Sequence, residues 1–254
     1  MAYKYILTIV PKFTSLLSII GSTMIISQVL QSKPNRNHTQ QRLVCVMSII
    51  DLTVSTAWFL TPFFVTQDMD QFLWSIGNRS TCSLQGFIVQ FSISGVLYNA
   101  SLSLYYLLVI KYGFQQRDII IIEKYMHAFA LLFGITTATT ALALNLYEDA
   151  NWDCWISPTK QTFQWTFFFA PLWIAIIFVV TCMLNIFLHV RSVERSSIQW
   201  SQVSGRVVRL TKTRAVAQQG ALYVGAFFVT WLFPTIARLV KLSGTEPPEW
   251  LVAL

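Results

Sequence analysis

Six long stretches of the chain contain almost no charged side chain, and this spacing constrains the fold more than any other feature of the sequence. Each stretch is 20 to 31 residues long, and together they contain a single charged residue, Asp51. A helix of about 20 apolar residues crosses the hydrocarbon core of a bilayer. We therefore expect six membrane-spanning helices, at about residues 13–32, 43–67, 82–111, 125–147, 162–190 and 215–240.

The composition excludes a soluble globular protein. Hydrophobic residues make up 54% of the chain and charged residues 11%, whereas soluble domains carry about 25% charged residues. So few charged side chains cannot cover a surface that faces water. The prediction is an all-α membrane protein with a single transmembrane domain over residues 1–254.

A further apolar segment begins at about residue 248, and the sequence ends at Leu254, too soon for this segment to cross a bilayer. Six complete helices and the start of a seventh favour a seven-transmembrane bundle. We therefore expect a seven-helix protein that is truncated at its C-terminus, or one domain of it.

The distribution of basic residues predicts the orientation. If the N-terminus lies outside, the three cytoplasmic loops (33–42, 111–124 and 189–214) hold twelve Lys and Arg, and the outer segments hold six. Cytoplasmic loops collect Lys and Arg, so we expect a multi-pass protein of the plasma membrane with its N-terminus outside. This placement explains the net charge of +7 without a nucleic-acid partner. The partner of the apolar helices is then membrane lipid. A glycosylation sequon at Asn78 would then be extracellular.

The four cysteines fall into two groups. Cys45 and Cys182 lie inside predicted helices, where buried free thiols are common. Cys82, at the outer end of the third helix, and Cys154, in the loop after the fourth, lie on the oxidising side of the membrane. We expect a disulfide between them, with two unpaired thiols as the alternative. No cysteine or histidine spacing fits a metal site, the three histidines are isolated, and we expect no metal and no cofactor.

Asp51 is a charged side chain deep inside a predicted helix. A charge near the middle of a bilayer costs at least about 2.5 kcal/mol on insertion scales, so we expect Asp51 to face the bundle interior and to have a partner. Asn99 in the third helix lies at a similar depth and is the candidate. A role in a conformational switch and a purely structural role are both open.

Two prolines mark kinks, Pro171 in the fifth predicted helix and Pro234 in the sixth. A proline inside a helix leaves the carbonyl one turn earlier without its amide partner and bends the helix. Trp231 and Phe233 lie beside Pro234, where a change in their packing could alter the bend. The alternative is that they only fill core or lipid-facing positions, because the chain has 19 Phe and 9 Trp.

In their order along the chain, four features resemble a G-protein-coupled receptor: Asp51 within Ser-Ile-Ile-Asp-Leu, Cys82 at the head of helix three, Asp-Cys-Trp-Ile at 153–156 and Trp-Leu-Phe-Pro at 231–234. Gly-Ser at 21–22, the loop Cys-Trp-Ile and Leu-Leu-Val-Ile-Lys-Tyr-Gly at 107–113 resemble most the cyclic-AMP-receptor-like branch, with some likeness to the secretin-like helical bundle. The resemblance covers nearly the whole chain.

The sequence departs from the rhodopsin-like class of these receptors. The Asp/Glu-Arg-Tyr motif of that class is absent from the inner end of helix three, where Lys111 and Tyr112 stand. Trp231 lies three residues before Pro234 rather than two.

The resemblance implies a cell-surface receptor that couples an unidentified extracellular ligand to a cytoplasmic heterotrimeric G protein. It also implies that the inner end of helix six swings outward on activation. The intramembrane switch residues would be Asp51, Asn99, Trp231, Phe233 and Pro234. The candidate G-protein contacts are Lys111, Tyr112, Arg206, Arg209, Lys212 and Arg214. For the basic residues of the loop before helix six, the alternative is that they only hold the loop inside.

A multi-spanning transporter or channel is the alternative function. Such proteins are often built from repeats with broken helices and a polar path, and this sequence has no repeat. An enzyme is not expected, because the sequence has no paired intramembrane acids, no histidine cluster and no Gly-x-Ser-x-Gly.

Overall fold

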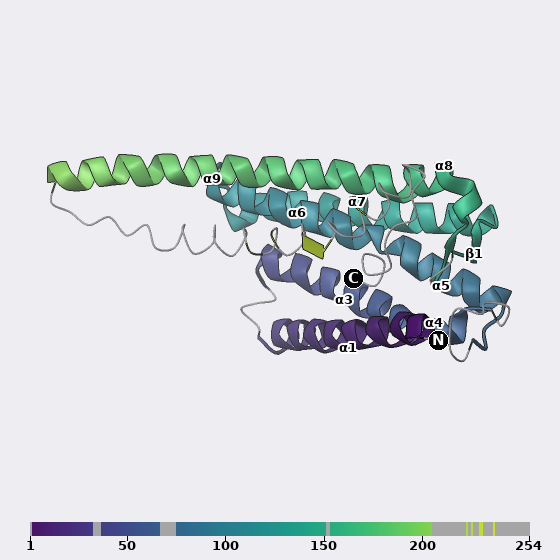
Figure 1. The fold of residues 1–254 in the computed structure, drawn as a ribbon. Helices are drawn as coiled ribbons and strands as arrows, with labels where there is room; N and C mark the ends of the chain where they lie inside the picture. Colours follow the sequence, from purple (N-terminus) through teal and green to yellow (C-terminus); the bar gives the residue numbers. More distant parts are fainter. Residues whose placement is uncertain are drawn as a thin grey trace.

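A computed structural model shows a bundle of long helices that run side by side (Figure 1). The structure describes residues 2–32, 37–66, 75–150 and 153–204, and the single positions Leu222, Gly225, Val229, Thr230 and Ile236. Within this part of the chain, five helical segments are long and apolar enough to cross a membrane. The all-α fold class is confirmed, and the chain is a multi-pass membrane protein. The helix expected at 215–240 and the start of the seventh lie outside the described ranges.

The helices follow one another with short connections. In chain order the elements are α1 (Ala2–Gln31), α3 (Thr39–Phe59), α4 (Thr61–Phe64), α5 (Arg79–Phe91), α6 (Ile93–Ile110), α7 (Gln116–Ala143), the strands β1 (Tyr147–Asp149) and β2 (Cys154–Ile156), the 3-10 turn η1 (Pro158–Lys160), α8 (Gln161–Gln164), the π-helical segment η2 (Trp165–Phe169) and α9 (Ala170–Ser204).

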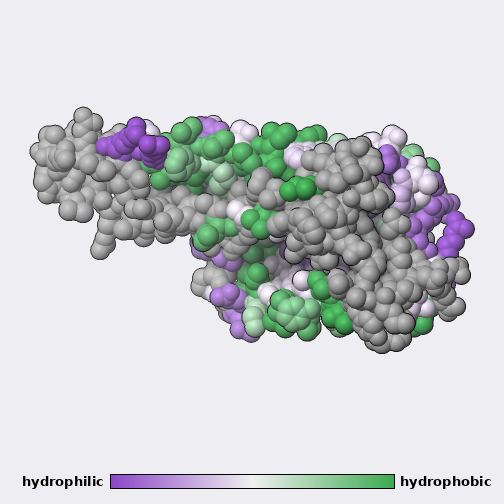
Figure 2. All heavy atoms as spheres, in the orientation of Figure 1, coloured by the Kyte–Doolittle hydropathy of each residue, from purple (hydrophilic) through white to green (hydrophobic). Residues whose placement is uncertain are grey.

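Helix α6 lies at the centre of the described bundle. It packs against α3, α7 and α9, while α1 packs on α3. The outer faces of α1, α7 and α9 expose large apolar side chains such as Phe13, Tyr125 and Phe187. On the face drawn in Figure 2, hydrophobic residues lie over the middle of the helices and hydrophilic ones gather towards the ends, which is the pattern of a bundle surrounded by lipid.

Two helix boundaries differ from the sequence-based expectation. The segment expected at 125–147 begins nine residues earlier, at Gln116, where Gln115 and Asp118 form a reciprocal capping box. It ends at Ala143, because Asn145 adopts the left-handed conformation with φ 50°. The amides of Asn145 and Leu146 then bond back to the carbonyls of Leu142 and Ala141, which is the Schellman pattern of a helix end.

A short β-hairpin follows this helix end and was not expected. Its strands are antiparallel and pair Tyr147 with Ile156, Glu148 with Trp155 and Asp149 with Cys154. The N-terminal end of α1, helix α4 and the hairpin lie at the same end of the bundle (Figure 1). We call this the outer end, and the opposite end, past which α9 extends, the inner end.

Candidate functional site

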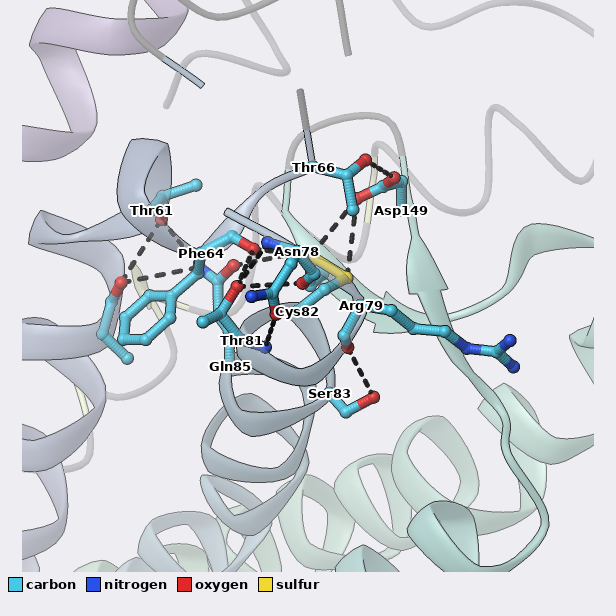
Figure 3. The surroundings of a disulfide bond; sticks show 12 residues. Thr61, Phe64, Thr66, Asn78, Arg79, Thr81, Cys82, Ser83, Gln85 and Asp149 are labelled. Atoms are coloured by element: carbon cyan, nitrogen blue, oxygen red, sulfur yellow. Dashed lines mark hydrogen bonds between the residues drawn. A yellow bond between two sulfur atoms is a disulfide. The ribbon is translucent and has the colours of Figure 1, made fainter. Parts of the chain in front are cut away.

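A disulfide holds the hairpin to the bundle at the outer end. It joins Cys82, in the first turn of α5, to Cys154, the first residue of β2, and both are buried (Figure 3). This is the pair expected from the sequence, and the alternative of two unpaired thiols is wrong. Cys45 and Cys182 are free and buried.

Asn78 caps α5 immediately before the disulfide. Its side chain accepts a hydrogen bond from the amide of Thr81 at 3.0 Å, and the hydroxyl of Thr81 accepts one from the amide of Asn78 at 2.8 Å. Thr81 also donates its hydroxyl to the Phe64 carbonyl at the end of α4. The start of α5 is therefore fixed to the preceding segment as well as to the hairpin.

A carboxylate lies against the disulfide. Oδ1 of Asp149 is 3.5 Å from Sγ of Cys82 and 3.3 Å from Sγ of Cys154, and its other oxygen accepts a hydrogen bond from Thr66 (Figure 3). These three side chains are close enough to hold a metal ion. Because the two sulfur atoms are bonded to each other, they offer no thiolate, and we assign no metal to the cluster.

Two glutamines of α5 connect the hairpin to the helices, and both are fully buried. Gln85 donates to the hydroxyl of Thr61 at 2.8 Å and accepts from the amide of Cys154 at 3.2 Å. Gln90, five residues further along α5, accepts from the indole nitrogen of Trp155 at 3.0 Å. Because both glutamines are buried and hydrogen-bonded to the hairpin, they are part of the outer-end site.

Gln90 also reaches the π-helical segment that precedes α9. Its side-chain nitrogen donates to the Phe167 carbonyl at 3.1 Å and lies 3.4 Å from the hydroxyl of Thr137 in α7. The Phe167 carbonyl precedes Pro171 by four residues, and Pro171 has no amide hydrogen to donate to it. Close to the position of the expected kink, a π-helical turn precedes Pro171.

Tyr147 anchors the first strand. Its hydroxyl donates to the Ala138 carbonyl of α7 at 2.9 Å, its side chain is buried, and burial raises the pKa of its hydroxyl. Its ring lies against Gly86 of α5, where an added β-carbon would come within 2.6 Å of ring atoms. Gly86 is thus required for the close approach of the hairpin to α5.

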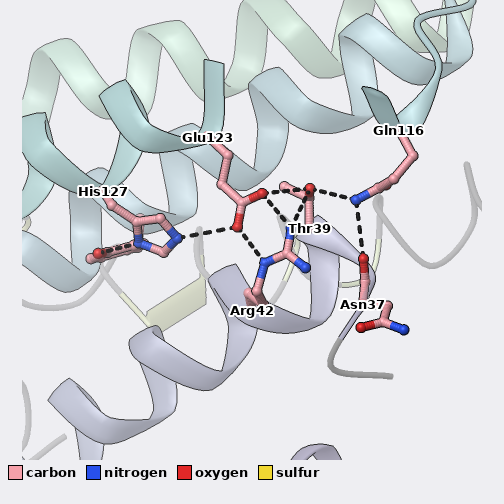
Figure 4. A network of polar contacts seen from close by, with 7 residues as sticks. Asn37, Thr39, Arg42, Gln116, Glu123 and His127 are labelled. Carbon is pink, nitrogen blue, oxygen red and sulfur yellow. Dashed lines mark hydrogen bonds and ion pairs between the residues drawn. The ribbon is translucent and has the colours of Figure 1, made fainter. Parts of the chain in front are cut away.

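A second polar network lies at the inner end (Figure 4). Glu123 of α7 is buried and forms an ion pair and hydrogen bonds with Arg42 of α3. It also accepts from Thr39 at 2.7 Å, and one of its oxygens is 3.5 Å from His127 Nε2. His127 Nδ1 in turn lies 2.7 Å from the hydroxyl of Tyr98 in α6. His127 is therefore not isolated, and the network joins three helices.

The two candidate G-protein contacts that directly follow α6 differ in their surroundings. Lys111 donates to Oδ1 of Asn185 in α9 at 2.7 Å, and its nitrogen lies 5.5 Å from the centre of the Tyr112 ring. Tyr112 itself is 59% exposed. Lys111 thus bridges two helices in this structure, while Tyr112 is available at the inner end.

The expected surroundings of Asp51 are not found. Its side chain is exposed rather than buried, and it makes no hydrogen bond or ion pair with any residue that the structure describes. It lies beside α6, with Oδ1 3.8 Å from where a β-carbon on Gly95 would be. The amide oxygen of Asn99 is buried and has no hydrogen-bond partner among the residues that the structure describes. No hydrogen bond joins Asp51 to Asn99 within the described residues, and the joint role of the two side chains stays a prediction.

The remaining candidate residues lie outside the described ranges. These are the switch candidates Trp231, Phe233 and Pro234, and the basic candidates Arg206, Arg209, Lys212 and Arg214. Conversely, sequence reasoning missed Gln85, Gln90, Tyr147, Arg42 and Glu123. A search for uncharged hydrogen-bonding side chains inside the third predicted span would have singled out both glutamines.

Comparison with known proteins identifies the family. A search of curated proteins finds no match. A family model described as the slime mold cyclic AMP receptor matches residues 2–252, which is nearly the whole chain. This agrees with the resemblance carried by Asp51, Cys82 and the segments 107–113 and 153–156, and the likeness to secretin-like receptors stays a prediction. The chain belongs to the slime mold cyclic AMP receptor family, a family of membrane receptors.

Proposed function

We propose that this protein is a cell-surface receptor whose outer end senses an extracellular ligand and whose inner end activates a heterotrimeric G protein. The observation that carries the proposal is the attachment of the hairpin to the bundle. A disulfide, Gln85 and Gln90 connect it to helices that run to the opposite end. A ligand that binds near the hairpin therefore acts on elements that reach the other side of the membrane.

The family suggests the first ligand to test, which is cyclic AMP. The family model carries that name, and its match extends over the outer-end elements α4, α5 and the hairpin. A ligand changes a conformational equilibrium only when it binds one state better than the other. We therefore propose that extracellular cyclic AMP favours the active arrangement of the helices.

The proposed coupling surface is the inner end, where cytoplasmic loops collect basic residues. Exposed Tyr112 supports this placement, as does α9, which continues past the inner ends of its neighbours (Figure 1). We propose that Lys111 and Tyr112 contact the G protein together with Arg206, Arg209, Lys212 and Arg214. Asp51, Asn99, Trp231, Phe233 and Pro234 remain the proposed switch residues.

The test is nucleotide exchange on a co-expressed G protein in membranes that contain the chain, with and without cyclic AMP. Exchange should rise with the cyclic AMP concentration and should not rise in membranes without the chain. The variant Lys212→Gln with Arg214→Gln should lower this exchange at matched surface expression. Other basic residues of the same loop, such as Arg191 and Arg195, still hold it inside.

A chain that drives exchange with another ligand, and not with cyclic AMP, would keep the receptor proposal and refute the ligand. A chain that activates no G protein in a broad panel, with any ligand or constitutively, would remove the main support for the receptor proposal. In that case the transporter or channel alternative would rise, and substrate uptake into vesicles would be the next measurement.

A further inference from the structure

Gln90 connects the extracellular hairpin to the π-helical segment η2 through a single buried side chain. Its oxygen accepts from the Trp155 indole of β2 at 3.0 Å, and its nitrogen donates to the Phe167 carbonyl of η2 at 3.1 Å. The side chain is fully buried, so neither group can exchange its partner for water without opening the bundle. The position of the hairpin and the backbone of η2 are therefore coupled.

The π-helical segment needs this support for a local reason. The amide of Ala170 bonds to the Trp165 carbonyl, five residues earlier, instead of the usual four. The next residue, Pro171, has no amide hydrogen, so the Phe167 carbonyl has no α-helical donor. Phe167 is half-buried, and a backbone carbonyl that is withdrawn from water without a donor is costly. Gln90 supplies the donor.

Ring contacts reinforce the same connection. Trp155 packs edge-on against Phe168 and Phe169 of η2, with ring centres 5.4 and 5.8 Å apart. A displacement of the hairpin therefore changes both the packing of η2 and the hydrogen bond that holds its carbonyl. Helix α9 continues directly from η2 to the inner end, where Asn185 accepts from Lys111.

We propose that Gln90 is a positioning residue that lets the hairpin control the π-helical turn at the head of α9. When the hairpin moves, Gln90 loses or shifts its bond to the Phe167 carbonyl, and the turn changes its hydrogen-bond register. A π-helical turn holds more residues than an α-helical turn, so a change in register rotates α9 relative to α5. This inference rests on the proposed receptor function for its signalling consequence, while its physical part concerns the chain alone.

The first arm of the test measures hydrogen exchange in the purified full chain without ligand. Gln90→Met keeps the size of the side chain and removes both hydrogen bonds. Amides in residues 165–172 should then exchange about five-fold faster, as expected for the loss of one net hydrogen bond. Gln85→Met is the matched control, because Gln85 is equally buried and none of its bonds reaches this segment. Its loss leaves the hairpin attached through the disulfide.

Two further variants locate the effect. Trp155→Phe keeps a ring against η2 and removes the indole N–H, so it should act in the same direction as Gln90→Met and add little to it. It also carries the test if Gln90→Met fails to fold. Pro171→Ala restores an amide that can donate to the Phe167 carbonyl. In that background Gln90→Met should change the exchange less than about two-fold.

The second arm measures G-protein nucleotide exchange against cyclic AMP concentration. Gln90→Met should shift the concentration for half-maximal response by at least about five-fold, the lower end of usual allosteric coupling. In the first arm, unchanged hydrogen exchange at residues 165–172 in Gln90→Met overturns the proposal. The same increase in hydrogen exchange in Gln85→Met also overturns it. A wild-type chain that ignores cyclic AMP refutes the proposed ligand and leaves the first arm to decide the physical part. A wild-type response that Gln90→Met reproduces unchanged overturns the signalling role.

Discussion

Glu123 shows how one residue can join three helices at the inner end. Its carboxylate bonds to Arg42 and Thr39 of α3, and His127 carries the contact on to Tyr98 of α6. A carboxylate so deeply buried persists only when its oxygens have partners. The network is therefore a structural clamp on α3, α6 and α7, whatever else it does in signalling.

Replacing Glu123 by Gln tests the clamp. Gln keeps the shape and removes the charge, so Arg42 faces a neutral partner. We expect a loss of about 1–3 kcal/mol in unfolding free energy, below the value for fully buried pairs because Arg42 is one-third exposed. Thermal unfolding in detergent measures it. The control Glu148→Gln breaks an exposed pair with Lys160 and should cost less than about 1 kcal/mol. Equal losses in both variants would contradict the clamp.

Tyr147 makes a prediction about pH. Burial raises the pKa of its hydroxyl, so the folded protein favours the neutral form. The stabilisation is complete below the unfolded pKa of about 10 and is lost as the pH rises above it. At neutral pH the unfolding free energy of the wild type should exceed that of Tyr147→Phe by about 1 kcal/mol, because the wild type has the hydrogen bond to the Ala138 carbonyl. Unfolding temperatures of both proteins should converge towards pH 11. A constant difference would show that the pKa of Tyr147 is the same in the folded and the unfolded chain.

At the scale of elements, charge spacing locates the described helices but not all of their ends. Helix α7 carries Asp118, Glu123 and Lys124 in its first turns, so a search for uncharged stretches begins it too late. The charge of Glu123 is tolerated because Arg42 of another helix neutralises it, which no local pattern reveals. The same holds for Gln85 and Gln90, whose partners lie far away in the sequence.

The hairpin could not be predicted from local pattern either. Its strands are three residues long, too short to show the alternation that marks a strand. Cys82 and Cys154 were predictable because topology alone places them on one side of the membrane. Asp51 differs from the expectation in its exposure. The depth of Asp51 in its span predicts burial, whereas its side chain is exposed beside α6, and its switch role stays a prediction.

The disulfide should matter to the hairpin as an element. It closes a loop over a sequence separation of 72 residues, for which loop entropy gives about 4 kcal/mol in a freely unfolding chain. Inserted helices constrain the unfolded state, so we expect about 2–4 kcal/mol from Cys154→Ser, seen as lower unfolding temperature and surface expression. Cys182→Ser, which removes a buried free thiol, is the control. Surface expression at the wild-type level in Cys154→Ser would show that Gln85 and Gln90 hold the hairpin without it.

At the scale of the whole molecule, the orientation in the membrane is a prediction of its own. Twelve of the eighteen basic residues fall within 33–42, 111–124 and 189–214, the segments that the sequence predicts to be cytoplasmic, so we expect the inner end to face the cytoplasm. An epitope tag at Asn78 should be accessible on intact cells. A tag at Gln202, near the end of α9, should need permeabilisation. Labelling of Gln202 on intact cells would reverse the topology and, with it, the proposed roles of the two ends.

The contact between Lys111 and Asn185 gives the inner end a tether between α6 and α9. If activation separates these helices, the tether restrains the resting state. If Lys111 also contacts the G protein, its charge serves a second purpose after the tether opens. Substitutions of Lys111 and of Asn185 should therefore give different results, because only Lys111 carries a charge that can contact the G protein.

Asn185→Leu should raise basal nucleotide exchange by about three-fold, from the loss of roughly one hydrogen bond, and should keep the maximal ligand response. Lys111→Met should also raise basal exchange but lower the maximum, since it removes the cation as well. Tyr112→Ala should lower only the maximum, because the side chain is exposed and takes no part in the Lys111–Asn185 hydrogen bond. Exchange in membranes with matched surface expression separates these patterns. Unchanged basal nucleotide exchange in Asn185→Leu would mean that the contact does not restrain α9. Equal losses of the maximal ligand response in Lys111→Met and Asn185→Leu would assign Lys111 to the fold rather than to the coupling surface.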